Sequence, residues 1–263
     1  GIYIDLGLND NGLATIEAVR QALIDFRKSG KFVYAYGEVI SQKAYYLATA
    51  ADKIFLNPSG GMELKGFGRE IMYYKGMFDK FGIEVQDFHC GAFKSAIEPF
   101  IRTNMSEPNR QQLASIYGDV YGLFLNNISN ERKIDTSELN KIVNGLLAEN
   151  PVTEKKLKLI DDALYYDQVI DAMKEKTGVE KKKDLKFIEL PKYATTMEKN
   201  LEASNKIAVV YAEGEIVDGE GSDDQIGGET FAKLISKLRK DEKIKAIVLR
   251  VNSPGGSALA SDV

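Results

Sequence analysis

The residues best suited to chemistry lie near the C-terminus, where an apolar run ends in two consecutive glycines. Ile247–Val251 has the composition of a buried strand and passes directly into Asn252-Ser253-Pro254-Gly255-Gly256, followed by a helix-like start. Two glycines after a strand allow close approach to the backbone and leave amide hydrogens unshielded, which is how an oxyanion site is built. The alternative is an ordinary strand-to-helix turn.

A nucleophile at such a turn needs a base, and the single histidine, His89, stands next to the single cysteine, Cys90. The sequence predicts a strand over Ile83–Cys90, in which neighbouring side chains point to opposite faces and cannot form a thiol–imidazole pair. One histidine and one cysteine do not make a typical zinc site, and no acidic cluster has metal-loop spacing. We therefore expect no metal and no other cofactor.

Lysine is the next candidate base, and Lys94 lies just past this predicted strand, in Gly91–Phe100. From there a side chain can reach over the edge of a sheet. A lysine acts as a base only when burial or a cationic neighbour lowers its pKa from about 10.4. The surrounding apolar residues, Ala92, Phe93, Ala96 and Ile97, permit such burial. A solvated loop lysine is the alternative.

The elements that position these residues have an α/β order. Apolar spacing predicts a helix over Thr15–Ser29 with Gly30 at its end, and a second helix over Arg69–Phe81 with Gly82 as its stop. Strands are predicted at residues 2–6, 32–36, 53–56 and 83–90. This β-α-β-β-α-β order predicts a largely parallel sheet with covering helices.

Three segments follow from the change of pattern along the chain. Residues 1–105 form the first α/β segment. Residues 106–204 are mainly helical up to about 178, with helices predicted from Ser106 and over 136–147, 153–164 and 167–176, and then read as a linker. Residues 205–263 begin a second α/β segment.

The two α/β segments look like copies of one unit. Residues 1–18 align without a gap on residues 246–263, which places Ile2 on Ile247 and Leu6 on Val251. Both stretches read as a strand, a polar turn and a helix start, and only the second carries Pro-Gly-Gly. A spaced similarity of this kind indicates an internal repeat.

Composition excludes several classes of protein. With 263 residues, 44% of them hydrophobic, the chain can bury a core as one or two domains. The formal net charge of −4 provides no basic field for nucleic acid, and a single cysteine excludes an internal disulfide. No stretch approaches the roughly 18 apolar residues that span a bilayer. Both ends read as cuts through an element, so we expect any anchor or signal to lie outside the chain.

Three separated stretches carry a resemblance to a known family. GAFKSAIEPFIR (91–102), YYLATAADKIFLNP (45–58) and VLRVNSPGGS (248–257) together resemble the signal peptide peptidase A, or protease IV, family in its long two-repeat bacterial form. The resemblance implies a Clp-protease and crotonase-like fold of two β-β-α repeats, the second truncated, joined by a helical segment. It also implies a serine–lysine dyad with Lys94 as general base, and Gly256, with Gly255 beside it, as oxyanion donor.

The resemblance places the nucleophilic serine in a segment of the type Ala-Ala-Ser-Gly-Gly-Tyr. Its counterpart in the first copy is residues 40–46, where Gln42 stands at the nucleophile position and Ser41 is one place out of register. The repeat offset puts the serine at about position 287, about 24 residues beyond Val263. Ser257 follows the two glycines, but in the family this position only opens the helix. We therefore expect the chain by itself to be inactive.

The implied function is a serine endopeptidase that degrades cleaved signal peptides. Its implied partners are extended apolar peptides and further copies of itself in a homo-oligomer. The implied location is the extracytoplasmic, periplasmic face of the bacterial inner membrane, reached through a membrane segment outside the chain. Two alternatives stay open: a crotonase-type acyl-CoA enzyme, whose oxyanion site would serve a thioester enolate, and an inactive scaffold or binding module.

Overall fold

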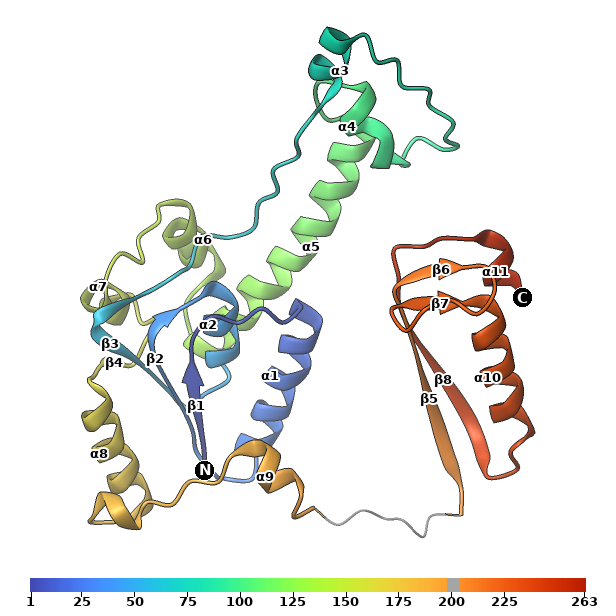
Figure 1. Cartoon of the computed structure of the whole chain (residues 1–263). Helices are drawn as coiled ribbons and strands as arrows, with labels where there is room; N and C mark the ends of the chain where they lie inside the picture. The colour runs from blue at the N-terminus through green and yellow to red at the C-terminus, as the bar shows by residue number, and fades with distance from the viewer. Residues whose placement is uncertain (198–203) are drawn as a thin grey trace. The chain divides into compact units, whose positions relative to one another are not determined.

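The computed structural model describes residues 1–197 and 204–263, which form two compact units, Gly1–Lys186 and Phe187–Val263. Figure 1 shows the elements of each unit along the chain. Each unit is described by itself below. The three-segment division at 105 and 204 stays a prediction.

The first unit contains a four-stranded parallel sheet. Its strands lie in the order β1 (Ile2–Leu6), β2 (Val33–Ile40), β3 (Lys53–Met62) and β4 (Asp162–Ala163). The register places Ile4 beside Ala35, and Ala35 beside Ile54. The predicted α/β class with a parallel sheet is confirmed, and β4 is an addition that two residues give no pattern to predict.

Helices form the crossover connections between these strands, because two parallel neighbours cannot be joined by a tight hairpin. Helix α1 (Leu13–Arg27) connects β1 to β2, and α2 (Gln42–Ala48) connects β2 to β3. The buried positions of α1 are Ile16, Arg20 and Leu23, at the helical spacing predicted from the sequence.

A buried arginine joins three helices of this unit. The Arg20 side chain is 2% exposed; its Nε donates to Thr49 Oγ1 at 3.3 Å and Nη2 to the Asn127 carbonyl at 3.3 Å. Its guanidinium also lies 5.3 Å from the centre of the Tyr46 ring. Because a buried cation is costly unless it is paired, these contacts make the packing of α1 and α2 on the long helix that carries Asn127 specific.

The middle of the chain is helical, as predicted. Its helices are α5 (Glu107–Arg132), α6 (Thr136–Asn144), α7 (Pro151–Lys156) and α8 (Tyr166–Thr177). The Ser106 hydroxyl caps α5 by accepting from the Asn109 amide, and Gly178 ends α8 with φ at +70°. Helix α7 ends before the predicted 164, because the following residues turn into β4 beside β3.

Two predicted elements between β3 and α5 are corrected. The helix predicted over Arg69–Phe81 is only α3 (Lys75–Phe81), although Gly82 ends it as expected with φ at +65°. The strand predicted over Ile83–Cys90 is absent, and this stretch has no regular structure. A strand needs a neighbour for its backbone groups, and in the described part of the chain none pairs with it. A short 3₁₀ helix (Ser95–Ile97) and α4 (Glu98–Ile101) follow.

Helix α5 is long and separates these short helices from the sheet. Figure 1 shows α3 and α4 beyond the N-terminal end of α5, away from strands β1–β4. The segment between α3 and α4 therefore does not lie at the edge of this sheet, where the sequence alone had placed it.

The second unit has a smaller α/β arrangement after a 3₁₀ turn (Lys182–Asp184) and α9 (Leu190–Ala194). Strands β5 (Lys206–Glu213) and β8 (Ile244–Asn252) pair in parallel, and so do β6 (Glu215–Val217) and β7 (Gln225–Gly227). Its remaining elements are α10 (Gly228–Lys240) and α11 (Ala258–Asp262). The part of the predicted linker at 198–203 lies outside the described residues.

The two aligned stretches have matching local structure. In each, a strand passes through a turn into a helix; the N-caps are Gly12 and Ser257 and the first helical residues are Leu13 and Ala258, which share alignment columns. The two-repeat interpretation remains a prediction. A superposition of residues 1–18 on 246–263 in a structure of the longer protein will test it.

A carboxyl group is buried beneath β3. Glu154 of α7 is fully buried, and neither carboxylate oxygen has a hydrogen-bond partner in the described part of the chain. Burial raises the pKa of Glu154 to about 7. The carboxyl is therefore most compatible with the folded state when it is protonated.

We predict that the stability of the first unit falls as the pH rises from about 4.5 to about 7. In this window Glu154 ionises in the unfolded chain, at its ordinary pKa of 4.5, while it stays protonated in the folded state, so the stabilisation is fully present below about 4.5 and is lost by the folded-state pKa of about 7. Over this range, Glu154→Gln should remove a pH-dependent loss of about 3 kcal/mol in urea unfolding. The exposed Glu149→Gln is the control; an unchanged slope in Glu154→Gln would contradict the prediction.

Candidate functional site

The turn after β8 requires glycine at both positions of its pair. Gly255 has φ at +108° and Gly256 has φ at +152°, conformations that other residues rarely adopt. A Cβ on residue 256 would lie 2.0 Å from the Ile216 carbonyl oxygen of β6. The turn can therefore pass against β6 only because residue 256 has no side chain.

Hydrogen bonds on both sides of Gly256 fix this contact. The Ile216 amide donates to the Gly255 carbonyl at 3.0 Å, and the Ser257 amide donates to the Ile216 carbonyl at 2.8 Å. Gly256 thus forms a parallel bridge with Ile216. In such a bridge the amide of the central residue points away from the partner strand.

The two candidate oxyanion donors differ in availability. The Gly255 amide donates to Ser253 Oγ at 3.1 Å and is occupied. The Gly256 amide makes no hydrogen bond to any described residue, and Gly256 is exposed. Of the two amides, that of Gly256 is free to stabilise a negative oxygen.

Ser257 has a structural role at the same turn. Its hydroxyl accepts from the Ala260 amide at 3.2 Å and so caps α11. The same hydroxyl donates to Asp218 Oδ1 at 2.6 Å. The hydroxyl hydrogen is directed at a carboxylate in the loop after β6, and no lysine or histidine lies among the described contacts of this hydroxyl.

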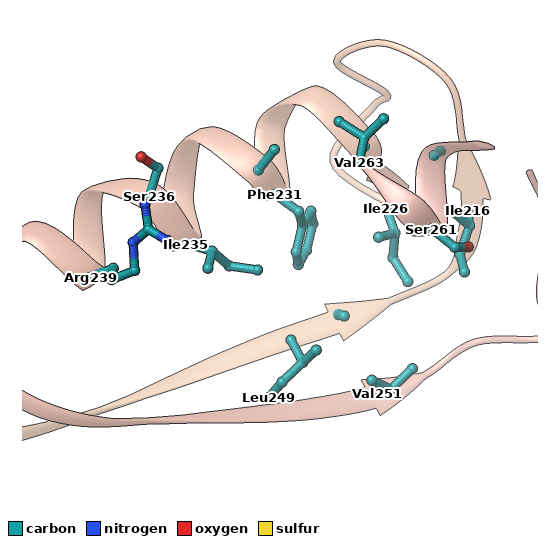
Figure 2. Close-up of a pocket in the computed structure, with 14 residues that line it drawn as sticks. Ile216, Ile226, Phe231, Ile235, Ser236, Arg239, Leu249, Val251, Ser261 and Val263 are labelled. Atoms are coloured by element: carbon teal, nitrogen blue, oxygen red, sulfur yellow. The ribbon is translucent and has the colours of Figure 1, made fainter. Parts of the chain in front are cut away.

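An apolar cavity of about 380 Å³ lies beside the turn, between β5 and β8 on one side and α10 and α11 on the other. Figure 2 shows Phe231 and Ile235 of α10 pointing toward Leu249 and Val251 of β8. The lining is mostly aliphatic and aromatic, with Arg239 as its charged member. The cavity can receive apolar groups, and its polar lining residues are Ser236, Ser261 and Arg239.

Lys94 is exposed in the first unit, whereas the surrounding sequence permits burial. It precedes the 3₁₀ helix as its N-cap, and its amide donates to the Gly91 carbonyl at 3.3 Å. Its neighbours Ala92, Phe93 and Ala96 are exposed as well. The missing strand over 83–90 explains the difference, because without a sheet beneath it this segment has little to pack against.

His89 and Cys90 do not act as a pair. His89 Nδ1 lies 2.7 Å from Asp87 Oδ1, and Cys90 is exposed and unoxidised. The conclusion drawn from the sequence therefore stands although its premise, an extended strand, was wrong. No group of three or more histidine, cysteine, aspartate or glutamate side chains within residues 1–197 and 204–263 is arranged to hold a metal.

Ser41 and Gln42 both have structural partners in the first unit. Ser41 caps α2 by accepting from the Ala44 amide. Gln42 Oε1 accepts from the Lys65 and Gly66 amides, each at 2.8 Å, and its Nε2 donates to the Gly66 carbonyl at 2.9 Å. Gln42 therefore holds the segment after β3 and has no free group for chemistry.

Comparison with known proteins decides the family. Residues 25–180, more than half of the chain, match the model of Peptidase family S49. The chain belongs to peptidase family S49. The resemblance to the signal peptide peptidase A family is confirmed.

Named relatives of this S49 chain are peptidases. It is 37% identical over 271 residues to Protease 4 of Salmonella typhi, covering 100% of the chain and 44% of that protein. It is 33% identical over 273 residues to the chloroplastic serine protease SPPA of Arabidopsis thaliana, covering 100% of the chain and 40% of that protein. A putative signal peptide peptidase SppA of Enterococcus faecium is 22% identical over 177 residues, which is 66% of the chain and 50% of that protein.

The chain thus spans less than half the length of the first two relatives. Across the described residues, no helix has both the length and the apolar character needed to cross a membrane.

Two side chains, one in each unit, bind candidate segments and escaped the sequence interpretation. Asp218 binds the Ser257 hydroxyl, and Glu98 binds the cap of α5. A signal existed only for Glu98, which stands before Pro99 at a helix start and eight residues before the predicted cap Ser106. Asp218 lies in an acidic, glycine-rich loop that looks merely solvated.

We predict that a fluorophosphonate probe does not label Ser41 or Ser257 of the purified chain specifically, because both hydroxyls cap helices and neither has a lysine or histidine among its described contacts. We also predict that the chain alone does not cleave an unfolded apolar peptide, since covalent catalysis requires an activated nucleophile. The measurement is mass spectrometry of the probe-treated chain together with a peptide cleavage assay. Labelling of either serine, with cleavage lost on its change to alanine, would show that the nucleophile is misplaced.

Proposed function

We propose that the full-length protein containing this chain is a serine endopeptidase that uses a serine–lysine dyad and degrades cleaved signal peptides. The observation that carries the proposal is the free Gly256 amide, held by β6 in a chain that belongs to a peptidase family. The names of the relatives support peptidase chemistry over thioester chemistry.

In the proposed reaction, a serine hydroxyl from outside residues 1–263 attacks the peptide carbonyl carbon. Lys94 accepts the serine proton, and the carbonyl π electrons move to the oxygen, which the Gly256 amide stabilises. The tetrahedral intermediate then collapses, the C–N bond breaks, and Lys94 gives its proton to the leaving amine. Water hydrolyses the acyl-enzyme by the same sequence of proton transfers.

The exposure of Lys94 in its own unit sets a condition on this mechanism. A lysine serves as a base only where its surroundings disfavour the charged form, and burial is the usual cause. We propose that the assembled active site of the full-length enzyme covers Lys94.

The proposed substrates are extended apolar peptides bound by strand addition. Backbone hydrogen bonds supply affinity in this mode, and alternate side chains enter pockets. The name of the Enterococcus faecium relative, a putative signal peptide peptidase, supports signal peptides as the substrate class. We further propose a homo-oligomer at the extracytoplasmic face of the bacterial inner membrane, anchored by a segment outside the chain.

We predict that Lys94→Ala and Lys94→Arg each lower peptide cleavage by the full-length protein by about 10²–10⁴-fold, because neither replacement accepts a proton near neutral pH. Folding, followed by circular dichroism and thermal unfolding, should be unchanged since Lys94 is exposed. His89→Ala is the matched control in the same segment and should retain activity within about twofold. Full activity in Lys94→Ala would refute the dyad.

A further inference from the structure

Glu98 is a buried carboxylate close to the candidate base. It is the first residue of α4, four positions after Lys94, and its residue is 7% exposed. Lys94 is the N-cap of the 3₁₀ helix Ser95–Ile97, which runs directly into α4. The backbone between Lys94 and Glu98 is therefore one short continuous helical segment.

Glu98 attaches this segment to the start of α5. Asn109 Nδ2 donates to Glu98 Oε2 at 2.9 Å, and the Ser106 amide donates to the same oxygen at 3.2 Å. The Ser106 hydroxyl donates to Glu98 Oε1. Ser106 is also the N-cap of α5, so the carboxylate binds the cap and the first turn of the long helix together.

The charge of Glu98 suits this position. Burial alone would raise the pKa of the carboxyl, but the hydrogen bonds from Ser106 and Asn109 and the nearby Arg102 outweigh burial and lower it. The N-terminus of a helix also favours a negative charge. Glu98 is therefore an ionised acceptor, and both of its oxygens accept hydrogen bonds.

Aromatic contacts hold the other side of α4. The Phe100 ring stacks on Tyr74 at 5.8 Å and on Phe78 at 6.1 Å between ring centres. The Tyr74 amide donates to the Pro99 carbonyl at 2.7 Å. Helix α4 is thus fixed between α3 and α5, whereas Gly91–Phe93 just before Lys94 is exposed and has no regular helix or strand.

We propose that Glu98 is the positioning residue of Lys94: by binding Ser106 and Asn109 it fixes the helical segment from which the lysine side chain projects. The inference rests on the proposed function, in which Lys94 is the base. A lysine with four rotatable bonds reaches one geometry reproducibly only when its backbone is fixed. A purely structural Glu98 would stabilise α4 without affecting the rate of the chemical step.

The test uses the full-length enzyme and the variants Glu98→Gln, Asn109→Ala and Glu98→Gln/Asn109→Asp. In Glu98→Gln, an amide nitrogen replaces one carboxylate oxygen, so a hydrogen-bond donor stands where Ser106 and Asn109 need an acceptor. In the double variant the hydrogen-bond direction is reversed, so that the new amide donates to a carboxylate at 109 and the negative charge stays at the start of α5. Glu107→Gln, an exposed change in the first turn of α5, is the control.

We expect Glu98→Gln to lower kcat by about 10–10²-fold with KM within about twofold, the pattern of lost transition-state geometry. Asn109→Ala should lower kcat less, and Glu107→Gln should leave it unchanged. The double variant should recover part of the loss, because it restores the contact with residue 109 but leaves the Ser106 amide without its acceptor. Hydrogen exchange of residues 94–101 should rise in Glu98→Gln and fall again in part in the double variant.

Wild-type kcat in Glu98→Gln and Asn109→Ala, with faster exchange or a lower melting temperature, would overturn the inference and leave a structural role. If Glu98→Gln does not fold, the test is the kcat of Asn109→Ala, and an unchanged value in that variant overturns the inference. If Lys94→Ala loses activity while Glu98→Gln and Asn109→Ala keep a normal kcat, the inference is refuted but the proposed function stands. Full activity in Lys94→Ala would refute the proposed function itself.

Discussion

Parallel strand pairing is the constraint on which both units depend. Parallel neighbours require a crossover connection, so α1 and α2 must separate β1, β2 and β3, and α10 lies within the crossover from β5 to its partner β8. The carboxyl ends of such strands are therefore left to turns that open helices. The turn at Gly255–Gly256 and the capped start of α2 at Ser41 are both turns of this kind. The position of the candidate oxyanion donor therefore depends on the parallel architecture as well as on the two glycines.

The elements with strong local signals were predictable from the sequence. Helix α1 has apolar residues at helical spacing, α5 opens with Ser106 and Pro108, and Gly178 ends α8 in a left-handed conformation. The glycine pair was recognisable for the same reason, because a strand run followed by two glycines restricts the local backbone. In each case the determining contacts lie within a few residues along the chain.

The predictions that failed concern segments whose structure depends on partners far away in the sequence. Residues 83–90 alternate like a strand, but alternation cannot supply a neighbouring strand, and Phe88 is left 91% exposed. Burial of Lys94 would have depended on that strand, and without the strand the residue is exposed. Glu98 could be seen as a helix-start acid, yet its attachment to Asn109 is tertiary and no spacing rule predicts it. The same holds for Asp218 and Ser257, 39 positions apart.

The structural role of Gln42 has a consequence for the two-repeat interpretation. The resemblance aligns it with the nucleophile position, and its amide satisfies two backbone N–H groups and one carbonyl of Lys65 and Gly66. A serine side chain is too short to reach all three groups, so a single substitution to serine would leave them unpaired in a partly buried place. A serine that replaced Gln42 would therefore require the segment after β3 to be rebuilt at the same time. In the two-repeat interpretation, this structural role makes the first copy hard to convert into a second catalytic centre.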